Sequence, residues 1–166
     1  MNAIPSEYLD DAIRSYEKYR DLGARAMAQL DDAQLFHVLD PESNSIAVIV
    51  KHLRGNMLSR WTDFLTSDGE KPDRDRDSEF EMAEGTTREE VERWWDEGWS
   101  TVISALQSLR PTDLDRVVTI RGEPHSVLQA IQRNLLHAAY HVGQIVLLAK
   151  HLRGEAWQSL SIPRRR

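Results

Sequence analysis

Apolar residues recur at helical spacing in four long stretches of the chain, at about residues 5–30, 45–65, 87–110 and 126–152. In the second stretch the apolar positions follow i, i+3, i+4 and i+7, which is the pattern of a helix with one buried face. Thr87 and Glu90 match a capping box at the start of the third stretch, and Pro111 and Gly154 stand where the third and fourth should end. The spacing therefore predicts four amphipathic helices, each long enough to cross a small domain.

Little of the remaining sequence has strand character. Val117–Ile120 and the Gly122 turn predict a short extended segment or small hairpin before the fourth helix. Four long helices with so little strand predict an all-α fold and a four-helix bundle. A length of 166 residues suits one domain, residues 1–166, with a core of its own.

The segment between the second and third helices, residues 66–86, is unusually long and acidic. It holds eight acidic and three basic residues, a net charge of −5 out of −6 for the whole chain. Bundle helices are usually joined by about two to eight residues, and longer connections are often lids or mobile linkers. We expect a solvated crossover loop here, with a lid as the alternative.

Composition excludes several classes of protein. A net charge of −6 argues against a general nucleic-acid binder, which needs a basic face to neutralise phosphates. No apolar run approaches the roughly 18 residues of a membrane span, and MNAIPSEYLDD has neither the basic end nor the apolar stretch of a signal peptide. We therefore expect a cytoplasmic protein that binds neither membrane nor nucleic acid.

The chain has no cysteine, so disulfides, thiolate metal sites and a cysteine nucleophile of its own are excluded. A metal here must be held by His, Asp or Glu. His137 and His141 lie four residues apart in the fourth helix, one turn along the same face and beside its apolar arc. Two imidazoles so placed can converge on one metal ion, although histidines spaced in this way are more often solvent-facing or hydrogen-bonded.

His52, on the second helix, is the candidate third ligand. It shares a stripe with Ser45, Asn56 and Ser59 at the border of the predicted core. Three neutral histidines with an open fourth position form a typical catalytic zinc site, and nickel or iron(II) also accepts imidazoles. The alternative is a hydrogen-bonded histidine at a helix edge.

Nearly the whole chain resembles one uncharacterised branch of the DinB-like, YfiT-type superfamily of metal-binding bundles. The resemblance rests on SIAVIVKHLRGNMLSRWTDFLTSDGEKPDRDRDSEF, HAAYHVGQI and the final WQSLSIP. It implies an up-down-down-up four-helix bundle with a long connection between helices two and three. It also implies a divalent metal (Zn, Ni or Fe) held by His52, His137 and His141.

Characterised relatives in that superfamily include S-transferases and an isomerase that use low-molecular-weight thiols such as bacillithiol, mycothiol or glutathione. The resemblance implies a metal-dependent transferase, in which a metal-bound cofactor thiol would attack a small-molecule electrophile. Gln144 would then orient a ligand or a metal-bound water, and Arg133 would pair with a substrate carboxylate. Asn56 is a further candidate for the surroundings of the metal or the substrate pocket. Two alternatives stay open: a metal-dependent hydrolase, and a non-catalytic metal-binding stress-response protein. We also expect a homodimer.

Overall fold

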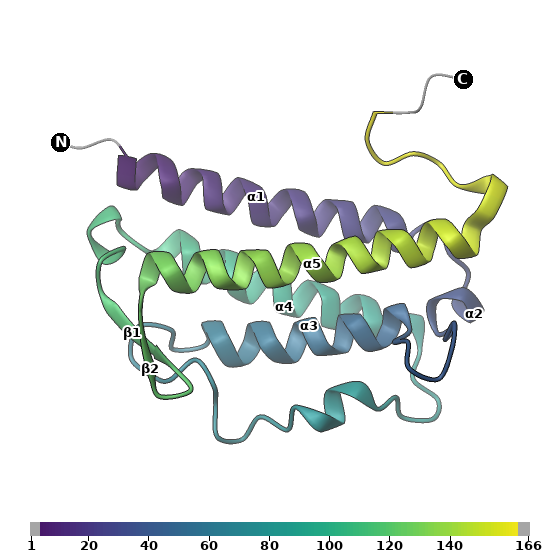
Figure 1. Ribbon diagram of the computed structural model, residues 1–166, viewed down its shortest axis with the longest axis horizontal. Helices are drawn as coiled ribbons and strands as arrows, with labels where there is room; N and C mark the ends of the chain where they lie inside the picture. The colour runs from purple at the N-terminus through teal and green to yellow at the C-terminus, as the bar shows by residue number, and fades with distance from the viewer. Residues whose placement is uncertain (1–3, 163–166) are drawn as a thin grey trace.

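Four long helices lie side by side in the computed structural model, which describes residues 4–162 (Figure 1). Their bounds are α1 Ile4–Met27, α3 Ile46–Trp61, α4 Arg88–Ser108 and α5 Val127–Arg153. In Figure 1, α1 and α5 run from left to right, and α3 and α4 run from right to left. The described part of the chain is therefore mainly helical, as predicted. The expected single domain also includes residues 1–3 and 163–166, which lie outside the described residues.

The predicted helix starts are confirmed by side-chain caps. Thr87 accepts a hydrogen bond from the backbone N–H of Glu90, whose side chain accepts one from the Thr87 N–H, so the capping box forms. Ser126 caps α5 in the same way with Gln129. Gly154 ends α5 with a φ of 55°, a conformation that favours glycine.

Two helices end earlier than their apolar pattern predicts. The first ends at Met27 instead of residue 30, and α3 ends at Trp61 instead of residue 65. Shortly after α3, Asp63 adopts a left-handed backbone conformation with a φ of 49°, which a continuing right-handed helix does not allow. A short helix, α2 (Asp32–Leu35), is present in the first connection and was not predicted, although the Asp31 and Gln34 capping box that begins it is a readable signal.

Aromatic side chains fill the centre between the helices. Tyr16 of α1 contacts Trp61 of α3 and Trp99 of α4 edge to face, with ring centroids 6.3 and 6.1 Å apart. All three rings are buried. Helices α3 and α4 approach closely at Gly98, where an added Cβ would lie 3.1 Å from the Arg54 Cα. Helix α5 packs mainly on α1 and also contacts α3, which places the histidine-bearing faces of α3 and α5 near each other.

The predicted hairpin is confirmed as strands β1 (Val117–Ile120) and β2 (Glu123–Ser126), which pair antiparallel. Arg121 and Gly122 form its two-residue turn with positive φ values of 58° and 75°, as a primed hairpin turn requires. The Asp68 carboxylate accepts hydrogen bonds from the backbone N–H groups of Glu70, Gly122 and Arg121. These bonds lower the pKa of Asp68 to about 2. The hairpin thus anchors the start of the long connection.

The expectation of a solvated crossover is wrong for part of residues 66–86. The 3₁₀ helix η1 (Asp77–Phe80) packs on α3, and Glu79 within it is only 5% exposed. The Arg74 side chain is likewise buried, at 5% exposure. Ion pairs in the interior, described below, hold these charged groups in place. Among residues 4–162, each helix is too short or too polar to span a membrane.

Candidate metal centre

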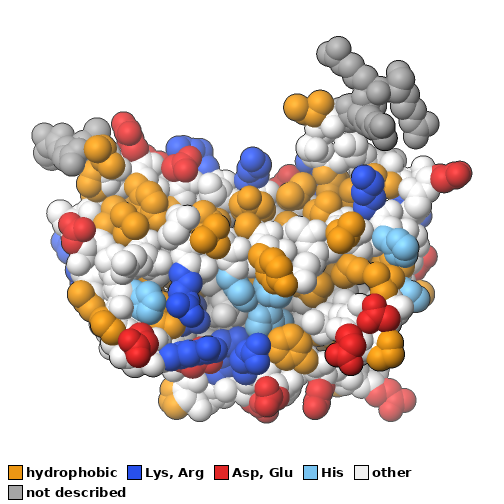
Figure 2. All heavy atoms as spheres, in the orientation of Figure 1, with side chains coloured by type: hydrophobic (Ala, Val, Ile, Leu, Met, Phe, Trp, Pro, Cys, Tyr) orange, Lys and Arg blue, Asp and Glu red, His pale blue; other side chains and the backbone are white. Residues whose placement is uncertain are grey.

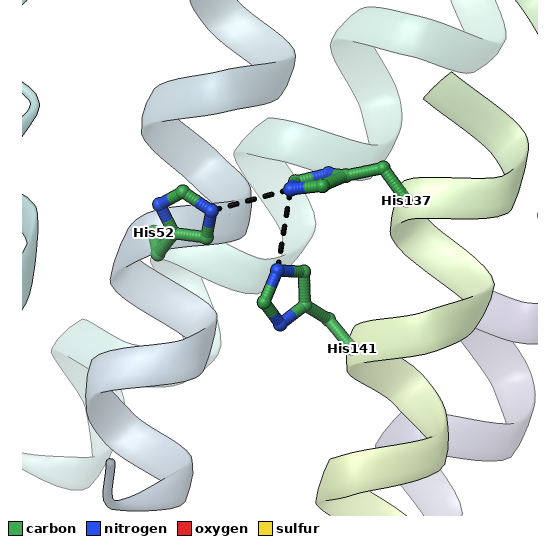
Figure 3. A group of neighbouring side chains, drawn as sticks. All are labelled: His52, His137 and His141. Atoms are coloured by element: carbon green, nitrogen blue, oxygen red, sulfur yellow. Dashed lines mark hydrogen bonds between the residues drawn. The ribbon is translucent and has the colours of Figure 1, made fainter. Parts of the chain in front are cut away.

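Three histidine side chains meet in the space between α3 and α5 (Figure 3). His52 extends from α3, and His137 and His141 extend from α5. The Nε2 atom of His137 lies 3.3 Å from Nε2 of His52 and 3.2 Å from Nε2 of His141. One nitrogen from each ring lies within 4.8 Å of the others. The structure therefore brings together the three residues predicted as ligands; their binding of a metal stays a prediction.

The outer nitrogens of two rings are tied to acceptors. His52 Nδ1 lies 2.8 Å from Glu79 Oε2, and His141 Nδ1 lies 2.7 Å from Gln144 Oε1. Because both partners are acceptors, each Nδ1 carries the proton, and each Nε2 presents a lone pair toward His137. The Nδ1 of His137 is buried and has no hydrogen-bond partner. Nitrogen lone pairs at this spacing are the donor set of a divalent transition metal, so the residues fit such an ion.

The surroundings favour the neutral form of His137 and His141. Burial, together with the neighbouring His141, His52, Arg60 and Arg74 charges, lowers the pKa of His137 to about 3. Burial also lowers the pKa of His141, although its hydrogen bond with Gln144 opposes this. Metal ligation requires neutral imidazole, so these two rings need release no proton near pH 7.

Glu79 holds His52 and is itself held by Arg74. The Arg74 Nε and Nη2 atoms donate to Glu79 Oε1 and Oε2 at 2.7 and 2.9 Å, a two-bond pairing. Burial would raise the pKa of Glu79, but hydrogen bonds from His52 and Arg74 outweigh it and lower the pKa. Gly55 of α3 leaves room for this carboxylate, since an added Cβ would lie 2.6 Å from Glu79 Cδ. A carboxylate behind a ligand histidine fixes the ring and raises its basicity.

Changing Glu79 to glutamine tests this support. We expect Glu79→Gln to weaken divalent-metal affinity by about 10- to 100-fold, because it removes the charge behind His52 and part of the Arg74 pairing. Competition with a chromogenic chelator measures the affinity. The matched control is Glu81→Gln, an exposed residue of the same connection. Equal affinities in the two variants would contradict the role of Glu79.

The other predicted residues also lie around the triad. The Gln144 Oε1 atom accepts a hydrogen bond from His141 Nδ1, and its amide nitrogen donates to the Tyr140 hydroxyl at 3.2 Å. Arg133 and Asn56 line a cavity of about 210 Å³ that is also lined by His52 and His137. The roles proposed for Gln144, Arg133 and Asn56 toward a ligand stay predictions.

Sequence reasoning missed the residues that the long connection contributes. Glu79 and Arg74 belong to this segment, and the Phe80 ring stacks on His52 with centroids 4.9 Å apart. Residues 66–86 contain eight acidic residues, and no local sequence pattern distinguishes Glu79 from the other seven as the partner of His52. The available signal was Gly55, since an isolated glycine inside a helical pattern often indicates close approach of another group.

Comparison with known proteins gives the family of the chain. A search of curated proteins finds no match. A family model described as "Protein of unknown function (DUF1572)" matches residues 3–166. The match spans nearly the whole chain, including all three histidines and the long connection. The chain therefore belongs to the DUF1572 family.

Proposed function

We propose that this protein is a DinB-like divalent-metal protein with His52, His137 and His141 as its ligands. In this proposal α1, α3, α4 and α5 form the up-down-down-up four-helix bundle of that superfamily. The observation that carries the proposal is the convergence of three Nε2 atoms while the Nδ1 atoms of His52 and His141 face acceptors. Zinc, nickel and iron(II) all suit a site of three imidazoles.

We further propose that the protein is a transferase that uses a low-molecular-weight thiol. A divalent cation at such a site lowers the pKa of a thiol in its open position, so that thiolate is available near neutral pH. The thiol comes from a cofactor, because the chain has no cysteine. Its sulfur forms a bond to an electrophilic carbon of the substrate, and the leaving group departs with its bonding electrons. His52 and His141 are held rigidly by Glu79 and Gln144, which fixes the geometry of the site.

Metal-dependent conjugation is the test. Protein stripped of metal and reloaded with Zn²⁺, Ni²⁺ or Fe²⁺ is mixed with 1-chloro-2,4-dinitrobenzene and one of several thiols: glutathione, cysteine or N-acetylcysteine. We expect at least one metal and thiol pair to release chloride faster than the same thiol with stripped protein. The appearance of the thioether absorbance measures the rate.

The controls separate the alternatives. Metal-dependent product formation without any thiol would support the hydrolase instead. Protein that binds metal but accelerates neither reaction would support a non-catalytic metal-binding role and contradict the transferase.

The homodimer and the cytoplasmic location stay predictions. Leu136, Tyr140 and Leu147 are all more than 60% exposed and recur on one side of α5. Exposed apolar side chains along one helix face support a protein partner there.

A further inference from the structure

A strongly basic cavity adjoins the histidine triad. His52 and His137 form part of its wall, and its volume of about 210 Å³ corresponds to roughly seven water molecules. Five arginines from α3, the long connection, the hairpin turn and α5 line it: Arg60, Arg74, Arg76, Arg121 and Arg133. Figure 2 shows basic side chains gathered beside a patch of histidine on this face. The arginines that could bind an anion thus line the same cavity as two of the histidines that could bind a metal cation.

The arginines are only partly neutralised by the protein. Glu79 pairs with Arg74, and Glu70 lies 3.2 Å from Arg74 and from Arg121. Among residues 4–162, Arg133 and Arg76 have no carboxylate partner within ion-pair distance, and Arg76 lies over the Phe80 ring instead. Five guanidinium groups therefore face two carboxylates, which leaves a local excess of positive charge.

Arg60 shows this imbalance most clearly. Only 6% of its surface is exposed, and its Nη1 atom has no hydrogen-bond partner. Its nearest carboxylate contact, Nη2 to Glu70 Oε2, is 3.8 Å, too long for a hydrogen bond. Gly69 packs against the side chain, where an added Cβ would lie 3.0 Å from Arg60 Cδ. Burying a charge without full pairing is costly, so an anion in the cavity would relieve this cost.

A chain of hydrogen bonds adds one more donor to the cavity. Trp61 Nε1 and the Tyr16 hydroxyl both donate to Asn134 Oδ1 at 2.9 Å. Asn134 Nδ2 must then donate to Asn56 Oδ1, also at 2.9 Å. Among the described residues, none accepts a hydrogen bond from Asn56 Nδ2. Asn56 lines the cavity and therefore offers it N–H groups.

We propose that this cavity binds the acidic end of the substrate or the thiol cofactor, a small compound with at least two negative charges on carboxylate or phosphate groups. As a subsite for the reacting molecule it rests on the proposed function, because it needs a reactive metal next to it. The binding itself does not need the metal. Arg133 and Arg60 contact the anion, and Asn56 donates to one of its oxygens.

Calorimetric titration of metal-stripped protein tests the proposal with three probes: succinate, inorganic phosphate and neutral succinamide. We expect saturable one-to-one binding of at least one anion and none of succinamide. A preference for succinate or for phosphate identifies the acidic group. In Arg133→Gln the affinity should fall about 10- to 100-fold, the loss expected for one charge-assisted hydrogen bond. Arg133 is exposed, so this variant should fold normally, which circular dichroism checks.

The matched control is Arg153→Gln, an exposed arginine of the same helix, which should bind like the wild type. Absence of binding by both anions would overturn the proposal, as would equal affinity in Arg133→Gln and the wild type. The metal measurement is separate. Protein that binds metal but neither anion contradicts only this inference. Protein that binds an anion but no metal contradicts the proposed function and leaves the cavity as an anion-binding site without a reacting metal.

Discussion

His137→Ala should lose its metal: we expect about one equivalent of divalent metal per wild-type chain and close to none in the variant. His137 Nε2 is the atom near both other ligand nitrogens, at 3.3 and 3.2 Å. Without it, two imidazoles on different helices remain, and a site with so few ligands holds metal weakly. Elemental analysis after exhaustive dialysis measures the stoichiometry. Alanine favours the helix, so the fold should persist.

His151→Ala is the control for this result, because His151 is an exposed histidine near the end of the same helix. It should keep the wild-type metal content. Full stoichiometric metal in His137→Ala would show that the assigned site is wrong.

Asn134→Leu should lower the free energy of unfolding by about 2 to 4 kcal/mol. Leucine has nearly the shape of asparagine, but it cannot accept the hydrogen bonds from Trp61 Nε1 and the Tyr16 hydroxyl. The indole N–H is then left buried without a partner, and the hydroxyl keeps only its longer contact with the Ile131 carbonyl at 3.3 Å. Urea unfolding followed by circular dichroism measures the change.

The control for this prediction is Gln132→Leu, an exposed position of the same helix. It should change stability by no more than about 0.5 kcal/mol. If Asn134→Leu were equally neutral, the buried donors would have found other partners, and the hydrogen-bond chain to Asn56 would not be structurally required.

The helices and the histidine pair were predictable because their signals are local. Apolar spacing and the Thr87 capping box indicated where α4 begins, and apolar spacing alone placed the start of α5 near Ser126. The pairing of His137 with His141 follows from one helical turn. His52 was predictable only as an edge position of a second helix, and its place opposite the pair depends on how α3 and α5 pack.

The support around the triad was not predictable, since it depends on contacts between distant residues. His52 and Glu79 are 27 residues apart, and the intervening chain has no regular period that brings them together. The acidic count of residues 66–86 was also misleading. Part of that charge, at Glu70 and Glu79, pairs with buried or half-buried arginines. The excess of acid in the sequence thus coexists with a basic cavity in the fold.

Gly55 has a consequence for attempts to make this protein more heat-resistant. Glycine within a helix is about 1 kcal/mol less favourable than alanine, so Gly55→Ala is a substitution that stability design would normally choose. Here the added methyl group would occupy the space of the Glu79 carboxylate. The helix would gain intrinsic stability while the carboxylate behind His52 was displaced. At position 55 the residue that would increase thermal stability would therefore disturb the histidine site, and the native glycine preserves the site.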